Sequence, residues 1–142
     1  MTLMGDTTPA PLSTRPKPLS IALWLCITIL GSVGANAMIA SLARAAGTPS
    51  DFQPHNPVSY TVLTAAGVLV GALAWAVTRS ASKNPRKMLS WLVPAVVAAS
   101  CIPDLFLLDQ GGTAGALAAA LMHVAPATIA VPIYRRLLPL PS

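Results

Sequence analysis

Long apolar runs alternate with short polar or proline-rich segments along the chain. In a helix, at about 1.5 Å per residue, each run is long enough to cross the roughly 30 Å of hydrocarbon in a bilayer. Lys, Arg, Asp and Glu are absent from the runs, with the exception of Asp104. The pattern predicts an all-α fold, a bundle of four transmembrane helices at about residues 20–43, 58–78, 88–108 and 114–134. We therefore expect one four-helix membrane domain, residues 20–136.

The helix breakers and the charges lie between and around these runs. Residues 1–19 are rich in Pro, Ser and Thr, a composition that cannot bury apolar area, so we expect a disordered cytoplasmic tail. The segment 44–57 holds prolines and a glycine, 79–87 is polar and basic, and 109–113 holds two adjacent glycines. Each is predicted to be a loop or a turn. Residues 137–142 are predicted to form a second cytoplasmic tail.

A cleaved signal peptide is the alternative for the first run. A basic segment, an apolar stretch and Ala-x-Ala sites at 35–37 and 43–45 are typical of such peptides. The run is longer than a typical signal core, so we favour a retained helix. Cleavage would leave three helices.

Composition points to lipid as the solvent. The chain of 142 residues is 54% hydrophobic and only 9% charged, and it contains no glutamate. A soluble domain carries about 25% charged residues. The net charge of +5 does not indicate a nucleic-acid partner, because the basic residues are separated by long apolar runs and do not alternate with aromatic ones. Membrane lipids are the expected partners.

The distribution of positive charge predicts the orientation. Every Lys and Arg except Arg44 falls on one side of the predicted bundle. Basic residues near helix ends are retained in the cytoplasm, so we expect a multi-pass protein with both termini cytoplasmic. Trp24, Trp75 and Trp91 lie near the predicted cytoplasmic boundary, which is where indole rings prefer to sit.

Small residues mark the expected contact faces, because they let helices approach closely in lipid. Gly67 and Gly71 form a GxxxG pattern, and Ser32, Asn36 and Ala40 recur every four residues on one stripe. A third small face is predicted on the last helix, formed by Ala116, Ala119, Ala120, His123, Ala127 and Ala130. Packing within the bundle is the favoured role of these faces. Self-association through Gly67 and Gly71, or contact with other membrane proteins, stays open.

Asn36, Asp104 and His123 are the candidate ligand-binding cluster. Ionisable groups at membrane depth are costly and often functional, and all three residues fall in the predicted outer half of the bilayer. Pro126 cannot donate to the carbonyl of Met122, which should leave an acceptor free beside His123 and a kink there. A polar pocket open to the outside would result. The simpler alternative is interhelical hydrogen bonding for His123 and Asn36, and a solvated helix end for Asp104.

No motif of an enzyme, a cofactor site or a metal centre is present. GxSxG, HExxH and a glycine-rich phosphate loop are missing, and no nucleophile is paired with a base. Cys26 and Cys101 do not form a CxxC pair. The acidic and histidine residues of the outer side lack metal-ligand spacing. We expect no catalysis, no cofactor and no metal.

Three segments resemble a domain-of-unknown-function family of small four-helix membrane proteins typical of actinobacteria. They are NPVSYTVLTAAGVLVGALAW (56–75), Trp91 with the following VPAVVAASCIPD (93–104), and ALMHVAPATIAVP (120–132). The Met122-His123 pair is the most specific element. The resemblance implies a four-helix architecture in a bacterial plasma membrane, and it implies no activity or catalytic residue.

Two functions are favoured, and a membrane enzyme is the least favoured third, because no nucleophile and base can be paired. The first is a structural or accessory subunit of a membrane assembly, whose basic loop meets anionic lipid headgroups or a partner. The second is a protein that binds or transports a small ligand or a proton through an outward-facing cavity lined by Asn36, Asp104 and His123. The sequence favours the first, because each polar residue has a structural explanation. The second requires the three residues to converge.

Overall fold

The computed structural model describes residues 17–141. Within this range the chain is helical and contains no strand. The elements are α1 (Pro18–Ala45), the short 3-10 helix η1 (Gln53–His55), α2 (Pro57–Ala81), α3 (Pro85–Ser100), the 3-10 helix η2 (Pro103–Leu107) and α4 (Leu108–Leu137).

Proline and asparagine define where the helices begin. Prolines occupy the first helical positions of α1, α2 and α3, where the missing N–H has no partner to lose. The Asn56 side chain accepts from the backbone N–H of Val58 at 2.9 Å and so caps α2. The Asn84 side chain accepts from Lys87 N–H at 3.2 Å and caps α3. Local sequence thus determines these helix starts.

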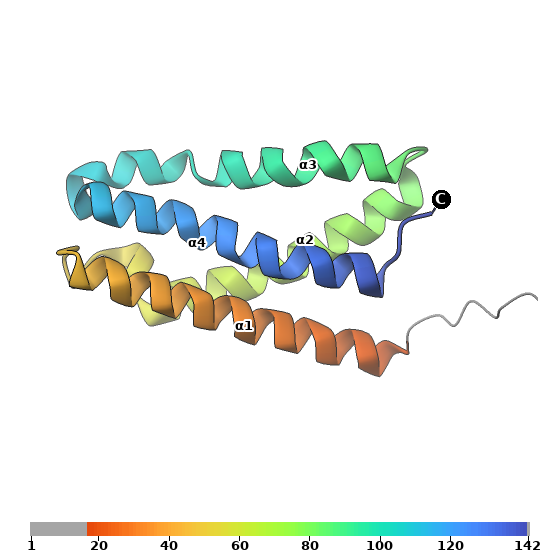
Figure 1. Cartoon of the computed structure of the whole chain (residues 1–142), viewed down its shortest axis with the longest axis horizontal. Coiled ribbons are helices and arrows are strands. Elements are labelled where there is room, and N and C mark those ends of the chain that lie inside the picture. The colour runs from red at the N-terminus through yellow and green to blue at the C-terminus, as the bar shows by residue number, and fades with distance from the viewer. Residues whose placement is uncertain (1–16, 142) are drawn as a thin grey trace, which may run out of the picture.

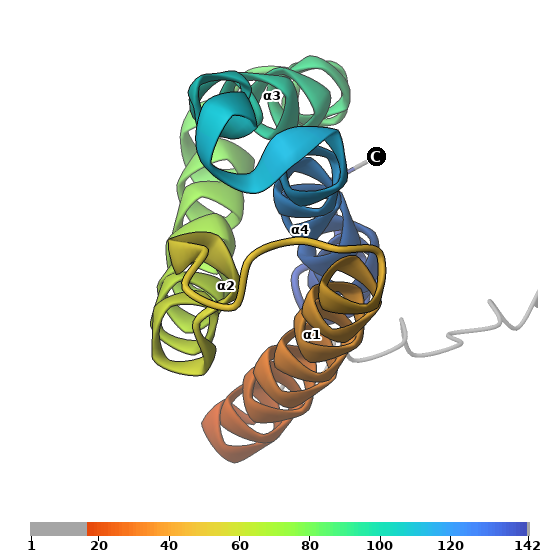
Figure 2. The ribbon, with the colours of Figure 1, turned by 90° about the vertical axis from the view of Figure 1, so that its left-hand side faces the viewer.

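The four α-helices lie along the long axis of the molecule (Figure 1). α4 runs between α1 and α3, and it packs most extensively against α1. The described chain begins and ends at the same end of the bundle, where the α2–α3 linker also lies. The α1–α2 loop and η2 lie at the opposite end, which we call the loop end. α2 lies beside α3 at the linker and diverges from it toward the loop end (Figure 2).

The third predicted helix ends earlier than the sequence indicated. α3 stops at Ser100, and residues 103–107 form η2, so Asp104 does not lie in an α-helix. Pro103 explains the change, because it has no N–H to donate to the carbonyl of Ala99. The predicted turn at 109–113 is also different. α4 begins at Leu108 and is interrupted at Gly112, whose φ of 63° and ψ of −176° are non-helical.

Three stretches of the described chain are long and apolar enough to cross a membrane: Pro18–Ala45, Pro57–Ala81 and Pro85–Leu137. The last stretch comprises α3, η2 and α4. Length and composition therefore distinguish three candidate spans and not the expected four. The reason is that α3, η2 and α4 follow one another closely and form one helical stretch of 53 residues, of which α3 alone accounts for 16.

The surface of these helices is apolar. Large hydrophobic side chains are exposed on every helix, among them Leu30, Leu63, Trp91 and Leu117. A contiguous apolar surface of this kind is unfavourable in water. Together with the length of the helices, it indicates a membrane protein.

Small and polar side chains form the contact face of α1. Its buried residues are Thr28, Ser32, Asn36, Ala40 and Ala43, which include the predicted stripe. The small face of α4 is also buried at Ala116, Ala119 and Ala130, while Leu117 and Leu121 are exposed. The helices therefore approach one another through small residues, as expected for packing in lipid.

Candidate functional site

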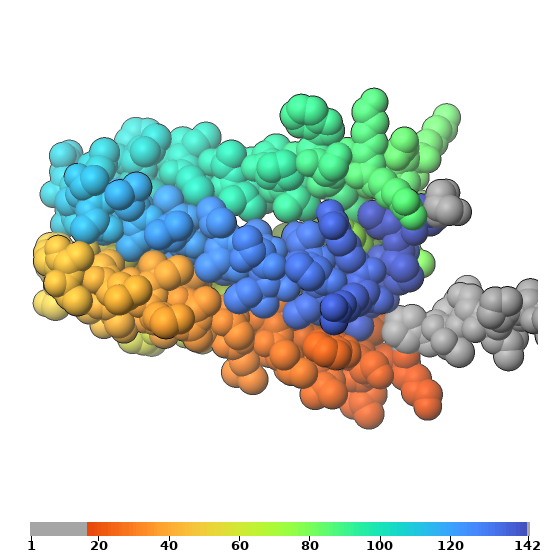
Figure 3. All heavy atoms as spheres, viewed as in Figure 1, coloured from red at the N-terminus to blue at the C-terminus, as the bar shows by residue number. Residues whose placement is uncertain are grey.

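A cavity of about 550 Å³ lies between α2, α3 and α4. Its walls are mainly apolar, and it extends from Trp75 to Gln53 of η1 at the loop end. The molecular surface is hollowed between α3 and α4 near the middle of the long axis (Figure 3). The cavity is therefore reached from the side of the bundle, where lipid would lie. It is large enough for a small organic molecule.

Two aromatic side chains close the cavity at the end nearest the linker. Trp75 is only 2% exposed and donates from Nε1 to the carbonyl of Leu138 at 3.1 Å. The Tyr134 hydroxyl donates to the carbonyl of Val68. The two rings are 5.9 Å apart between centroids. Trp75 was predicted near the cytoplasmic boundary; the indole is buried in the core, and its N–H bonds to the Leu138 carbonyl.

Asp104 and His123 meet at the other end of the cavity. His123 Nε2 lies 3.4 Å from Asp104 Oδ2, and the two side chains are 43% and 9% exposed. η2 delivers the carboxylate, because Pro103 ends α3 and turns the chain there. Asp104 Oδ2 is buried and forms no hydrogen bond. The imidazole is therefore the group that can stabilise the Asp104 carboxylate. A protonated His123 would form an ion pair with it.

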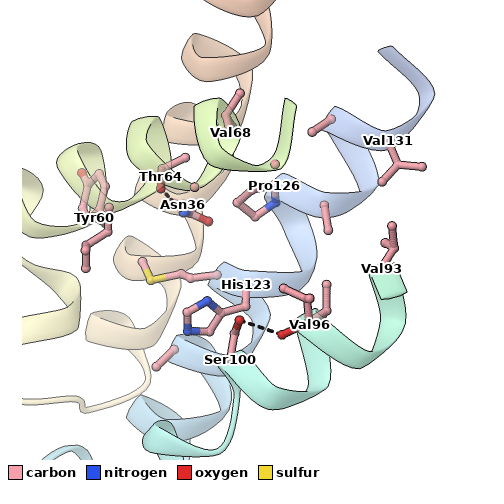
Figure 4. Close-up of a pocket in the computed structure, with 18 of the residues that line it drawn as sticks. Asn36, Tyr60, Thr64, Val68, Val93, Val96, Ser100, His123, Pro126 and Val131 are labelled. Atoms are coloured by element: carbon pink, nitrogen blue, oxygen red, sulfur yellow. Dashed lines mark hydrogen bonds between the residues drawn. The ribbon is translucent and has the colours of Figure 1, made fainter. Parts of the chain in front are cut away.

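Asn36 lines the same cavity but does not join this pair. Its Nδ2 donates to Thr64 Oγ1 at 2.8 Å, which ties α1 to α2 (Figure 4). Its Oδ1 is buried and has no hydrogen-bond partner. His123 projects from α4 into the same space, opposite Ser100 of α3 (Figure 4). The structure thus places all three candidate residues on one cavity, two of them in contact and the third bonded to Thr64.

Sequence reasoning missed several residues of this cavity. Thr64 could have been found, because it is a hydrogen-bonding residue within an apolar run. Trp75 and Tyr134 resembled boundary residues, and nothing in the sequence indicated that they would meet. Gly67 and Gly71 also line the cavity. A side chain at Gly71 would contact Tyr134, whereas the Cβ position of Gly67 has no atom within 4 Å.

A compact cap covers the loop end beside the cavity. Phe52 is buried against Gly111 and Gly115 of α4. His55 is fully buried, and neither of its ring nitrogens has a hydrogen-bond partner. The Arg44 guanidinium donates to the His55 carbonyl. Burial, and then the positive charge of Arg44, lower the pKa of His55 from its usual 6.5, so this imidazole is neutral at neutral pH.

Metal-ligating side chains do not gather elsewhere in the described chain. Among residues 17–141, no three His, Cys, Asp or Glu side chains come close enough to hold a metal ion. His123 and Asp104 form a pair only. The chemistry that this pair offers is hydrogen bonding, charge pairing and proton exchange.

The long apolar helices indicate an α-helical membrane protein. Within that class, the model of a family of unknown function, DUF6069, matches residues 18–139. The chain belongs to this family. No curated protein matches the chain, and no solved structure matches it.

Proposed function

We propose that this protein binds a small amphipathic molecule in the cavity between α2, α3 and α4. The observation behind the proposal is the Asp104–His123 pair, at 3.4 Å, on the wall of a cavity that is otherwise mainly apolar. Ionisable side chains at membrane depth are costly and often mark functional sites. The apolar walls suit the body of such a molecule, and the pair suits its polar group.

The proposal includes a membrane topology. We infer four membrane-spanning segments, with α3 and η2 together forming the third, and both ends of the described chain on the cytoplasmic side of a plasma membrane. The basic linker and the two chain ends lie at the same end of the bundle (Figure 1), in agreement with the retention of positive charge in the cytoplasm. The cavity then extends toward the outer face.

A cavity-filling substitution tests binding. Naphthylethanol, a neutral aromatic alcohol, and naphthylethylamine, its cationic counterpart, serve as probes for the purified protein in detergent. Gly67→Phe places a ring in the cavity without a clash at Cβ, where no atom lies within 4 Å. We expect saturable binding of at least one probe by the native protein and about a tenfold or greater loss in Gly67→Phe, measured by calorimetry.

Gly34→Phe is the matched control. Gly34 also has no atom within 4 Å of its Cβ position, and it lies on α1 outside the cavity. Binding should be unchanged in this variant. If neither probe binds saturably, or if Gly67→Phe and Gly34→Phe bind alike, the proposal is wrong.

A structural or accessory role in a membrane assembly is the competing function. Its support is the exposed apolar surface, which a partner helix could cover as well as lipid. In that case His123→Ala would lower the stability of the bundle and leave probe binding unaffected. The binding proposal expects instead that His123→Ala changes probe binding and leaves the stability of the bundle nearly unchanged.

A further inference from the structure

The unpaired polar atoms on the cavity wall are hydrogen-bond acceptors. Asp104 Oδ2 and Asn36 Oδ1 are both buried without a hydrogen-bond partner, and both residues line the cavity. The donors at the aromatic end are already occupied, because Trp75 and Tyr134 bond to backbone carbonyls. Pro126 adds the carbonyl of Met122, which lacks the helical donor four residues on. Asp104 Oδ2 and Asn36 Oδ1 are therefore free to accept from a ligand.

The charge of the lining residues also favours a ligand that donates hydrogen bonds. Among the described residues that line the cavity there is no Lys or Arg, and Asp104 is the one carboxylate. Its nearest titratable neighbours are His123 and Cys101, and the lining also includes Tyr60 and Tyr134. Thiols and phenols are ordinarily uncharged at neutral pH. Only His123 can therefore balance the carboxylate, and it does so only while it holds a proton.

We propose that the ligand is a lipophilic ammonium ion, and that its binding releases a proton from the Asp104–His123 pair. This inference rests on the proposed function of the cavity. The ammonium ion donates to Asp104 and takes the place of the proton as the countercharge, and its apolar part lies along the walls toward Trp75.

The charge balance explains why exchange is favoured over simple addition. With one proton on the pair, the carboxylate and imidazole together are neutral. Adding a cation to that state would leave a net positive charge at membrane depth, which is costly. When the proton leaves His123 for the solvent as the ammonium ion arrives, the net charge of the cavity does not change. An anionic ligand would have to compete with Asp104 for His123, the one lining side chain that can take up a positive charge.

One aromatic side chain supports a cation as well. Tyr60, near the start of α2 at the loop end, contributes to the walls, and ring faces attract cations, most strongly when the cation is desolvated. A neutral ligand would gain nothing from this arrangement beyond apolar contact. The preference for a cation should therefore be measurable against a neutral molecule of the same shape.

The test compares naphthylethylamine with naphthylethanol on the full-length protein in detergent, using calorimetry with protein-free micelles as the blank. We expect the amine to bind about tenfold or more tightly than the alcohol near pH 8. Asp104→Asn should abolish this preference while alcohol binding is retained, which also shows that the variant is folded. Asp104→Glu should restore part of the preference.

Asp109→Asn is the control, because Asp109 is exposed and does not line the cavity. It should leave the preference unchanged. Proton competition gives a second readout. Amine affinity should fall by about tenfold or more as the pH drops from about 8 to about 5, and this dependence should disappear in His123→Gln.

The outcomes separate the two proposals. If both probes bind in the cavity with equal affinity, the protein binds small molecules but the ligand is not a cation. If the amine binds more tightly with no pH dependence in the native protein, proton exchange is wrong. If neither probe binds, both the inference and the proposed function fail.

Discussion

Phe52 fixes the loop end of the bundle by filling a space that only glycine leaves open. An added Cβ at Gly111 would lie 2.5 Å from Phe52 Cε2 and 2.7 Å from its Cζ. Because Phe52 is buried, the ring has little room to withdraw. We expect Gly111→Ala to lower the free energy of unfolding in detergent by about 1–3 kcal/mol.

Gly34→Ala is the control for this substitution, since no atom lies within 4 Å of its Cβ position. Alanine is the better helix former, so this variant should be unchanged or more stable by up to about 1 kcal/mol. Replacing the ring with a smaller side chain in the double variant Phe52→Leu/Gly111→Ala should recover part of the lost unfolding free energy. Equal stability of Gly111→Ala and the native protein would contradict the packing of Phe52.

His55 should make the stability of the cap depend on pH. Its pKa in the folded protein lies below the usual 6.5 because of burial and then Arg44. The unfolded chain therefore takes up a proton first as the pH falls. Stability is at its full value above the unfolded pKa, and it decreases as the pH falls from 6.5 toward the folded pKa.

Thermal unfolding in detergent between about pH 8 and pH 5 measures this decrease. His55→Phe keeps an aromatic ring against Phe52, which His55 contacts edge-on at 4.8 Å, and it removes the titration. The variant should show a smaller decrease than the native protein. The same decrease in both would exclude His55 as its source. The variant His123→Gln shows how much of the decrease in stability comes from the histidine of the cavity and not from His55.

The residue types at the site could be predicted from the sequence, but their partners could not. Asn36, Asp104 and His123 were found because polar residues are rare in apolar runs. Their neighbours depend on the rotation of each helix about its axis and on the turn at Pro103. Asn36 therefore bonds to Thr64, which lies on another helix, and Trp75 is buried although its position in the sequence suggested a lipid boundary.

Helix α1 is held by a narrow face of small and polar residues. Ala40 is among its most buried residues, at 2% exposure, and the face packs mainly against α4. Ala40→Leu adds volume where the backbones approach closely. We expect a loss of about 1–3 kcal/mol in unfolding free energy. Met38→Leu, on the exposed face of α1, should have little effect, and equal effects in the two variants would contradict this packing.

The starts and ends of the helices show which signals in the sequence predict a helix boundary. The starts of α2 and α3 follow from proline and asparagine caps that act locally. The end of α3 was predicted eight residues too late because apolar residues continue to Leu108, and hydropathy does not register the break at Pro103. The turn predicted at 109–113 is reduced to an interruption of α4 at Gly112, whose φ of 63° favours glycine.

At the scale of the whole molecule, the arrangement of the helices creates the cavity. α2 diverges from α3 toward the loop end (Figure 2), and this divergence leaves the space that the cavity occupies. α4 forms a third wall of the cavity and supplies His123. A tightly packed four-helix bundle would have no such space. The open geometry therefore supports a binding function over a purely structural one.

Orientation in the membrane can be tested with two single cysteines in a variant that lacks Cys26 and Cys101. Asp51→Cys lies in the α1–α2 loop, and Lys83→Cys lies in the α2–α3 linker at the opposite end. Because basic residues are retained in the cytoplasm, a membrane-impermeant maleimide added to intact cells should label position 51 and not position 83. Permeabilised cells should show labelling at both positions.

Labelling of position 83 alone in intact cells would contradict this prediction. It would mean that the orientation is the opposite one, and that Asp104 and His123 lie in the inner half of the membrane. Ligands would then enter the cavity from the inner leaflet.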